Sequence, residues 1–466
     1  MSAGLLTRRQ LALAAALAPL AGHAQAPYTE SDLAIAARLR DSGLQSPLGY
    51  ELAVSLVREV GPRPGGSAAD ALAVRWATQQ MARLGLANVR AEPVPFTSWR
   101  RGPASVELLA PDAQPLVASA LGNSPGTNGV LEGEVAYYPD LAALKSDPGP
   151  RARGRIVFID QKMRRTRDPS GYGEAAPARF FGPIEAARRG ALALVVRSIG
   201  TDHAPVAHTG MMALDAQVPP IPALAVSIPD AERIAAQHAA GRTPRLRIRM
   251  DNTRESATTH NVVGEIPGDE LAHEVVLIGA HLDSWDTSPG ALDDAAGVGI
   301  VLAAARNMLD AGVRPRRTVR VVLFGNEENG LDGAEAYARK YEGVTHQLVG
   351  ESDLGSDRIW RVRWRARPEA QPALAAIADL LRPLGIDAQS SPGTPAPDAS
   401  ILMRRRGWPA VDLSQDASRY FDVHHTPNDT VDKLDPAALA QNVAAWSAVA
   451  WLASQSRTAF GPLPAP

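Results

Sequence analysis

Five short segments of the chain are rich in histidine and carboxylate side chains, the groups that hold metal ions in proteins without cysteine. Three of them directly follow apolar runs whose length suits buried strands. The carboxyl ends of parallel strands meet at one edge of a sheet, where ligands bind in α/β proteins. The five segments are residues 281–286 (HLDSWD), 290–294 (GALDD), 327–328 (EE), 351–353 (ESD) and 424–430 (HHTPNDT).

Carboxylates and imidazoles gathered at one sheet edge would repel and desolvate one another unless cations lay among them. The sequence therefore predicts a metal site. Because the chain contains no cysteine, any metal must be held by His, Asp or Glu. This nitrogen and oxygen ligand set fits zinc, with manganese or cobalt as alternatives.

The elements that position these segments alternate between strands and helices from residue 261 onward. Strands are expected at residues 275–280, 319–324 and 348–351, with a helix at 294–311. A last helix should begin at Pro436 behind the cap Asp435. The pattern predicts an α/β fold with a mixed, mostly parallel sheet flanked by helices.

Two other regions precede this sheet. Residues 46–96 show a helical pattern, broken into two helices at 61–66, with Ser67 as the cap of the second. Residues 102–250 are typical of a β-rich region with a single short helix at 183–189. Its strands are expected at residues 133–138, 156–160, 191–197 and 221–228.

Length and charge exclude several classes of protein. A chain of 466 residues is about three times a typical domain of roughly 150 residues, so two or three domains are expected. The net charge of −2 comes from 48 basic and 50 acidic residues without a long run of one sign. Neither nucleic acid nor an anionic membrane is therefore an expected partner.

Residues 1–26 have the pattern of a signal peptide. Arg8 and Arg9 precede an apolar stretch at 11–20, and Ala24-Gln25-Ala26 matches a small-x-small cleavage signal. The apolar stretch is shorter than the roughly 20 residues needed to span a bilayer, and the paired arginines resemble a twin-arginine signal. We expect cleavage after Ala26, export to the periplasm or the medium, and no membrane span in the mature chain.

A serine hydrolase is the main competing reading, because Gly122-Asn123-Ser124-Pro125-Gly126 matches the G-x-S-x-G pattern. The residue after the nucleophile must donate its backbone N–H to the oxyanion hole, and Pro125 has no N–H. The serine mechanism is therefore rejected.

In order and local context, the five segments resemble the signature blocks of the co-catalytic zinc aminopeptidase and carboxypeptidase family, in particular its carboxypeptidase Q branch. Residues 184–187, 208–210, 218–222 and 230–232 resemble the protease-associated insert of the same branch. The resemblance implies the zinc exopeptidase fold. It divides the mature chain into residues 27–112 and 251–466 for the peptidase domain and 113–250 for a β-rich protease-associated insert.

Carried over by position, the resemblance also implies a role for each site residue. Two zinc ions per subunit would be expected, with Asp294 reserved for capping the following helix. Asp293 would bridge the ions, His281 and Asp353 would complete one, and Glu328 and His425 the other. Glu327 would be the general base acting on a metal-bridging water, Asp283 would accept the second ring N–H of His281, His424 would donate to the oxyanion, and Asp398 would lie near a substrate terminus.

The activity implied is that of an exported dizinc exopeptidase acting on dipeptides or short peptides with free termini. A broader N-terminal aminopeptidase is the alternative within the same class. A zinc-dependent glutaminyl cyclase and a non-catalytic binding protein remain as alternatives from other classes, although no expected ligand is missing. The expected partner is the peptide substrate, and the branch resemblance suggests a homodimer.

Overall fold

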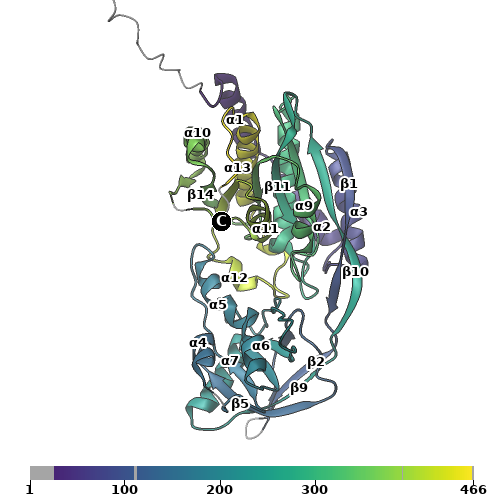
Figure 1. The fold of residues 1–466 in the computed structure, drawn as a ribbon, viewed down its shortest axis with the longest axis vertical. Coiled ribbons are helices and arrows are strands. Elements are labelled where there is room, and N and C mark those ends of the chain that lie inside the picture. The colour runs from purple at the N-terminus through teal and green to yellow at the C-terminus, as the bar shows by residue number, and fades with distance from the viewer. Residues whose placement is uncertain (1–25, 110–112, 149, 391, 464–466) are drawn as a thin grey trace, which may run out of the picture.

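The chain folds into two lobes, each built around a mixed eight-stranded sheet (Figure 1). The computed structural model describes residues 26–109, 113–148, 150–390 and 392–463. The signal peptide expected at residues 1–26 therefore lies outside the described residues, apart from Ala26. No helix in the described part of the chain is long and apolar enough to cross a membrane.

The first sheet has the strand order β1-β10-β12-β11-β13-β16-β14-β15. Its central strands β12, β11, β13 and β16 run parallel. On one side of them, β10 pairs antiparallel with β12, and the edge strand β1 pairs antiparallel with β10. This confirms the expected mixed sheet. The strands are β1 (Ala87–Arg100), β10 (Thr253–Ile266), β11 (Leu271–His281), β12 (Arg317–Phe324), β13 (His346–Glu351), β14 (Ile359–Arg365), β15 (Asp387–Ala388) and β16 (Ala410–Gln415).

Helices cover both faces of the first sheet because alternate strand residues point to opposite sides. Val276 and Ile278 of β11 pack in one core, while Val275 and Leu277 pack in the other. The first core is covered by α1 (Glu30–Gly43), α2 (Leu48–Glu59), α3 (Ala68–Arg83), α8 (Ala296–Asp310), α10 (Gln371–Leu381) and α13 (Pro436–Gln455), and the second by α9 (Asp332–Lys340) and α11 (Pro397–Arg406). Shorter turns are η1 (Ala291–Ala295), η2 (Pro368–Ala370), η3 (Arg382–Leu384), η4 (Val431–Lys433) and α12 (Tyr420–Val423).

The second lobe is inserted in the chain between β1 and β10, which pair along their length and lead toward it (Figure 1). Its sheet has the order β3-β2-β9-β5-β6-β7-β8-β4. Helices α4 (Leu141–Ser146), α5 (Ser170–Phe180) and α6 (Gly182–Arg188) contribute to the core on one face, and α7 (Ile228–Ala239) to the core on the other. The strands are β2 (Ala104–Leu108), β3 (Gln114–Pro115), β4 (Ala118–Ala120), β5 (Leu131–Tyr138), β6 (Ile156–Ile159), β7 (Ala193–Arg197), β8 (Ala223–Val226) and β9 (Arg245–Met250).

The expected elements of the first sheet are confirmed, as are two helix caps. Strands β11, β12 and β13 contain the predicted ranges, and helix α8 matches its predicted range to within two residues at each end. The Asp435 carboxylate accepts the N–H groups of Ala437 and Ala438 at the start of α13. Ser67 likewise accepts the N–H of Asp70 at the start of α3.

Two secondary-structure predictions are wrong. The helical pattern expected up to residue 96 ends with α3, because residues 87–100 form the edge strand β1, where Pro93 and Pro95 are tolerated and a helix interior would not accept them. The described part of the second lobe contains four helices rather than one. Helix α5 includes Gly171, Gly173 and Pro177, which lower its helix propensity and conceal it from a pattern-based prediction.

A buried histidine in the first lobe makes stability depend on pH. His346 begins β13, stacks on Trp408 with 3.6 Å between ring centroids, and lies 2.9 Å from the Tyr337 hydroxyl. Burial lowers its pKa to about 3. The unfolded state, where histidine has a pKa of about 6.5, therefore binds the proton first as pH falls.

We predict that the stabilisation from neutral His346 is complete above pH 6.5 and is lost progressively below it. The loss by pH 5 should be about 2 kcal/mol, at about 1.4 kcal/mol per pH unit. Urea unfolding at pH 7.5 and pH 5 should show a smaller difference for His346→Gln than for the wild type. The exposed His273→Gln is the matched control. An equal pH dependence in all three proteins would contradict the prediction.

Candidate metal centre

Histidine and carboxylate side chains from separate elements meet at the carboxyl edge of the first sheet. Two groups of three have ligand atoms within 4.8 Å of one another: Asp293, His424 and His425, and His281, Asp353 and the same Asp293. His281 is the last residue of β11, Glu327 and Glu328 follow β12, Asp353 follows β13, Asp293 lies in η1 before α8, and His424 and His425 follow α12.

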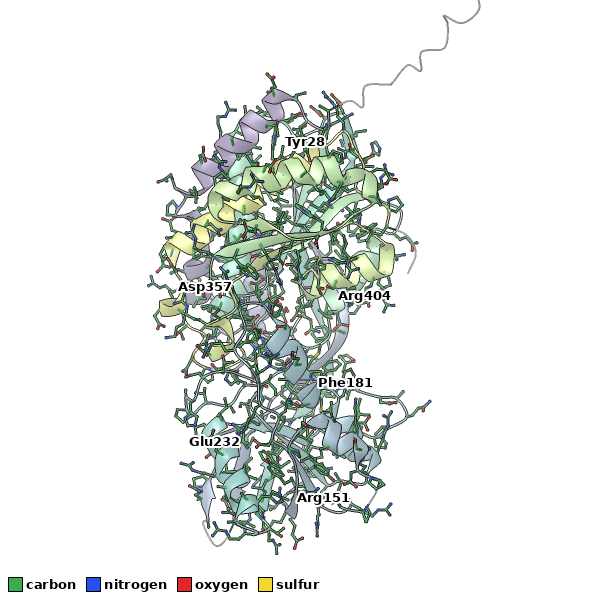
Figure 2. All side chains as sticks on the ribbon, turned by 90° about the vertical axis from the view of Figure 1, so that its left-hand side faces the viewer. Tyr28, Arg151, Phe181, Glu232, Asp357 and Arg404 are labelled. Carbon is green, nitrogen blue, oxygen red and sulfur yellow. The ribbon has the colours of Figure 1, made fainter. Side chains whose placement is uncertain are left out.

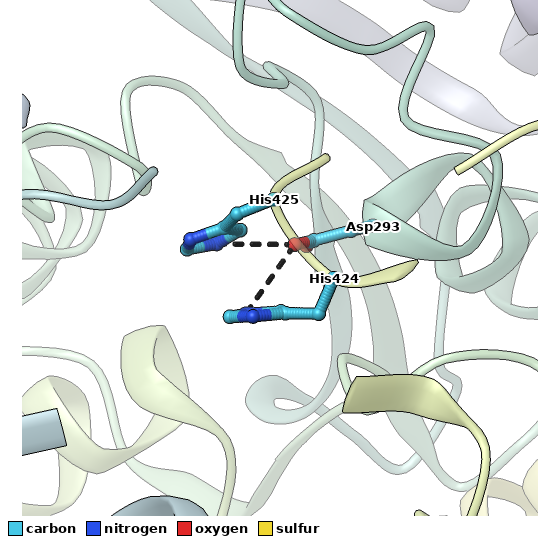
Figure 3. Close-up of side chains that lie close together, drawn as sticks. All are labelled: Asp293, His424 and His425. Atoms are coloured by element: carbon cyan, nitrogen blue, oxygen red, sulfur yellow. Dashed lines mark ion pairs between the residues drawn. The ribbon is translucent and has the colours of Figure 1, made fainter. Parts of the chain in front are cut away.

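Asp293 lies at the centre of the cluster and presents one carboxylate oxygen to each side. Its Oδ1 is 3.0 Å from His281 Nε2, and its Oδ2 is 3.2 Å from His425 Nε2. Figure 3 shows this carboxylate facing the rings of both His424 and His425. His425 Nε2 is also 3.1 Å from Glu328 Oε2, and Asp353 Oδ1 is 3.7 Å from His281 Nε2. The structure thus brings together all five residues expected as ligands.

The electrostatics of this cluster fit a bound cation. Although burial alone would raise it, the pKa of Asp293 lies well below its usual range because His281 and His425 contact the carboxylate. Burial and the charge of Asp293 raise the pKa of Glu328 to about 7. Within the described residues, Asp293 Oδ2 and Glu328 Oε1 are buried without a hydrogen-bond donor. These buried carboxylate oxygens and the imidazole nitrogens that they face form a set of ligand atoms that suits a divalent metal such as zinc.

Glu327 lines the cavity beside this cluster, held through the backbone by Asp283. The N–H of Glu327 donates to Asp283 Oδ1 at 3.0 Å, and the N–H of Glu328 donates to Asp283 Oδ2 at 3.3 Å. Burial raises the pKa of Glu327 well above its usual range. For the ring N–H of His281, the Asp283 backbone carbonyl at 3.1 Å is closer than the carboxylate at 3.7 Å. Asp283 therefore orients both the glutamates and His281.

His424 is a buried and neutral neighbour of the cluster. Its ring stacks on that of His425 with 3.5 Å between centroids, and its Nε2 lies 3.7 Å from Asp293 Oδ2. Burial and the adjacent His425 lower the pKa of His424 well below its usual range. Its Nδ1 has no hydrogen-bond partner in the described part of the chain. A neutral ring on the cavity wall can donate a hydrogen bond without carrying charge.

Asp398 lies behind the cavity rather than on its wall. It is fully buried in the first turn of α11, whereas its neighbour Glu351 lines the cavity. Burial and the charge of Glu351 raise the pKa of Asp398 well above its usual range. Glu351 Oε2 accepts the N–H of Ala399 at 2.9 Å. Asp398 thus contacts the residue that faces the cavity and does not itself face it.

Arg63 stabilises the loops next to the cluster, and sequence patterns did not single it out. It is fully buried, and its guanidinium donates to the carbonyl oxygens of Leu282, Pro289 and Gly290 at 2.6, 2.6 and 3.2 Å. Burial lowers its pKa, an effect opposed by nearby carboxylates including Asp283. These hydrogen bonds tie together the two loops that carry His281 and Asp293. In the sequence, Arg63 lies in a proline- and glycine-rich turn without any local signal of this role.

Two further carboxylates orient backbone around the ligands. Asp429 Oδ1 and Oδ2 accept the N–H groups of Leu292 and Asp293 at 2.7 and 3.2 Å. Asp294 Oδ2 accepts the N–H of His281 at 3.1 Å, and its Oδ1 accepts the N–H of Gly297 in the first turn of α8. Asp294 therefore caps the helix, as predicted, and also holds β11.

The second lobe contacts both histidines that follow α12. The ring Nδ1–H of His425 donates to the Thr209 carbonyl at 3.3 Å, and the N–H of Thr209 donates to the His425 carbonyl at 3.1 Å. The ring Nδ1–H of His208 donates to the His424 carbonyl at 2.8 Å. Because these contacts are long-range, sequence patterns could not assign them. The second lobe therefore helps to set the orientation of His425.

A cavity of about 670 Å³ opens onto the cluster. Its walls include Glu327 and His425 from the first lobe and Tyr172 and Arg179 from α5 of the second. In Figure 2, Arg404 of α11 is on the upper lobe, and Phe181, immediately after α5, is on the lower lobe. A space of this size suits a small ligand rather than a folded protein chain.

Comparisons with known proteins place this geometry in context. A model of "Peptidase family M28" matches residues 261–450. Carboxypeptidase Q from Bos taurus is 32% identical over 408 residues, which cover 86% of this chain and 84% of that protein. The range that the family model matches includes every residue of the cluster.

Solved structures extend the similarity to the fold. A peptidase M28 precursor from Shewanella amazonensis is 43% identical, with a TM-score of 0.89, and the match covers 93% of this chain and 99% of that one. An aminopeptidase from an Aneurinibacillus strain has a TM-score of 0.61 at 23% identity, covering 91% of this chain and 98% of that one. At that identity, the second match is evidence about the fold alone.

We predict that Arg63→Lys weakens metal binding, since a lysine cannot reproduce the fork of hydrogen bonds to the two ligand-bearing loops. Loss of such an outer contact should reduce Zn²⁺ affinity by about 10- to 100-fold. Competition with a chromophoric chelator measures the affinity. Arg58→Lys, an exposed position on α2, is the matched control and should bind like the wild type. Equal affinity in both variants would show that Arg63 does not support the site.

Proposed function

Since the chain belongs to peptidase family M28, we propose that it is an exported zinc-dependent exopeptidase that hydrolyses dipeptides or short peptides with free termini. The observation that carries this proposal is the placement of Asp293 between His281 and His425. Glu327 lies on the wall of the same small cavity and can act as a base.

Two zinc ions would be held by residues that the structure already brings together. His281, Asp293 and Asp353 would hold one ion, and Asp293, Glu328 and His425 the other. When bound, the ions would polarise the scissile carbonyl and make a nearby water more acidic. Without metal, protonated imidazoles would balance the charge of these buried carboxylates. The positive charge of the bound ions would take over that role.

Glu327 would move the proton during hydrolysis. Burial raises the pKa of its carboxylate, which makes it a stronger base. Glu327 would take a proton from the attacking water and deliver it to the leaving amine. Asp283 holds the backbone of Glu327 in place by accepting its N–H. The neutral ring of His424 would donate a hydrogen bond to the oxygen of the scissile carbonyl.

Cavity size and lining favour an exopeptidase. The cavity of about 670 Å³ is bounded by both lobes, which restricts the length of a bound peptide. Glu351 lies on its wall, and its carboxyl oxygens could accept hydrogen bonds from the protonated amino terminus of a peptide. A broader N-terminal aminopeptidase remains the second candidate, since a wall that binds the free amino terminus would serve a longer peptide as well.

The remaining regions also have proposed roles. Residues 113–250 would be a protease-associated insert whose helix α5 forms part of the cavity wall. Residues 1–26 would direct export and be removed. Asp398 would act by supporting Glu351 near the bound amino terminus.

We predict that purified mature protein releases amine from a dipeptide with both termini free, and does so only with zinc present. The N-acetylated dipeptide should not be cleaved, and the C-amidated dipeptide and a tetrapeptide should be cleaved more slowly. Equal cleavage of the dipeptide, the amide and the tetrapeptide would favour the aminopeptidase. No zinc-dependent cleavage of any of the four would refute the proposed function.

A second prediction separates the base from the ligands. Glu327→Gln should retain zinc but lower turnover by about 10²- to 10⁴-fold, because it removes the proton acceptor. Asp293→Ala should instead lower the zinc content, measured by elemental analysis after gel filtration. The exposed Glu342→Gln serves as the control for both measurements. A fully active Glu327→Gln would contradict the assignment of Glu327 as the base. An unchanged zinc content in Asp293→Ala would contradict the bridging role of Asp293.

A further inference from the structure

Arg179, in the last turn of α5, is a buried cation without a carboxylate partner among the described residues. Its side chain is 5% exposed. Its Nη1 donates to the Thr209 carbonyl at 3.2 Å, and its Nη2 donates to the Tyr172 hydroxyl at 2.7 Å. Its Nε is buried and has no partner within the described chain. Both acceptors are neutral, so within the described residues no carboxylate is hydrogen-bonded to the guanidinium.

Other buried arginines of the described chain have carboxylates close by. Arg63, which makes no ion pair in the described part of the chain, lies near Asp283 and other carboxylates that oppose the effect of its burial. Arg197, which is also 5% exposed, has Asp160 Oδ1 at 2.6 Å from its Nε. Arg317 and Arg320 likewise have glutamate oxygens at 2.6 and 2.9 Å. Burying an uncompensated charge costs several kcal/mol, so a site that retains one is suited to bind an anion.

The position of Arg179 connects it to the proposed catalytic centre. Its guanidinium and the ring of His425 both donate to the Thr209 carbonyl. Tyr172, which accepts the other hydrogen bond, packs edge-on against the ring of His424 with 5.1 Å between centroids. Arg179 and both histidines line the same cavity. An anion on this guanidinium would therefore lie beside the residues that act on the scissile bond.

The fold keeps space for this guanidinium. Gly210 has a φ of +137°, and a Cβ atom added to it would lie 2.4 Å from Arg179 Cζ. A side chain at this position would displace the arginine. The hydrogen bond to Tyr172 and the absence of a side chain at Gly210 thus leave the guanidinium in a defined place on the cavity wall.

We propose that Arg179 binds the C-terminal carboxylate of a dipeptide substrate, an inference that rests on the proposed exopeptidase function. In a dipeptide, the carboxylate carbon is two bonds from the leaving nitrogen, so an anchor for it must lie beside the catalytic centre. The planar guanidinium matches a carboxylate with two parallel hydrogen bonds. A longer peptide or an amide would present a neutral group there. The second lobe would therefore supply the selectivity for a free C-terminus.

Other arginines on the cavity wall are less suited to this role. Arg361 is paired with Asp168 at 3.2 Å, and Arg363 with Asp412 at 2.6 Å. Arg404 also lacks an ion pair within the described residues, but it is exposed on α11, where water already solvates its charge. Arg404 is the competing anchor that the experiment must separate from Arg179.

The test compares a free dipeptide with its C-terminal amide as substrates of wild type, Arg179→Gln, Arg179→Lys and Arg404→Gln. Arg179→Gln should raise KM for the free dipeptide by about 10- to 100-fold, the range for losing hydrogen bonds to a charged group, and leave the amide within about twofold. Arg179→Lys should recover part of the loss because it keeps the charge. Arg404→Gln should keep the wild-type preference.

A binding measurement makes the inference independent of turnover. The wild type is titrated calorimetrically with a free amino acid, which is the product on the leaving side, and with the amide of that amino acid. The free amino acid should bind more tightly than the amide, and Arg179→Gln should abolish this difference. Circular dichroism and zinc content verify that each variant is folded and loaded. Equal losses on dipeptide and amide, or a preference lost in Arg404→Gln instead, would overturn the assignment. If no peptide is cleaved, the proposed function fails, and the titration still decides whether Arg179 binds carboxylate.

Discussion

Several carboxylates are buried beside the imidazole rings of His281 and His425 at one edge of the first sheet, and the surrounding elements must hold these charges together. Like charges in a water-poor pocket repel one another, and each loses its hydration. Asp293 lies between His281 and His425, and each of its carboxylate oxygens faces one imidazole nitrogen. Each oxygen can therefore contact either a protonated imidazole or a metal ion bound by that nitrogen. The loops around the cluster help to hold these like charges close together.

The backbone around the cluster is held mainly by hydrogen bonds to buried charged groups. Asp283, Asp294 and Asp429 accept backbone N–H groups of the loops that carry the ligands, and Arg63 donates to the carbonyls of two of these loops. Such bonds fix the loops before any ligand is bound, which spares the site the entropy of ordering them later. The alternation of β11 contributes as well, because its side chains anchor the strand in cores on both faces of the sheet.

The second lobe completes the site rather than standing apart from it. Thr209 and His208 contact the chain at His425 and His424, and α5 and α12 lie between the two lobes (Figure 1). Ion pairs between Arg165 and Asp422 and between Arg167 and Asp416 connect the lobes nearby. These pairs are partly exposed, so each contributes little alone, and the buried contacts of Thr209 and His208 carry more of the orientation.

Sequence patterns predicted three central strands of the first sheet, the order of the polar segments that follow them and the residues that meet at their ends. This was possible because the carboxyl ends of parallel strands converge, so His281, Glu328 and Asp353 become neighbours once their strands are recognised. The residues that surround them become apparent in the folded chain alone. Arg63, Thr209 and Arg179 act across more than 200 residues or from the other lobe, and Asp398 proved to lie behind Glu351. A local pattern records propensity and periodicity, whereas burial and the pairing of charge depend on which distant segments the fold brings into contact.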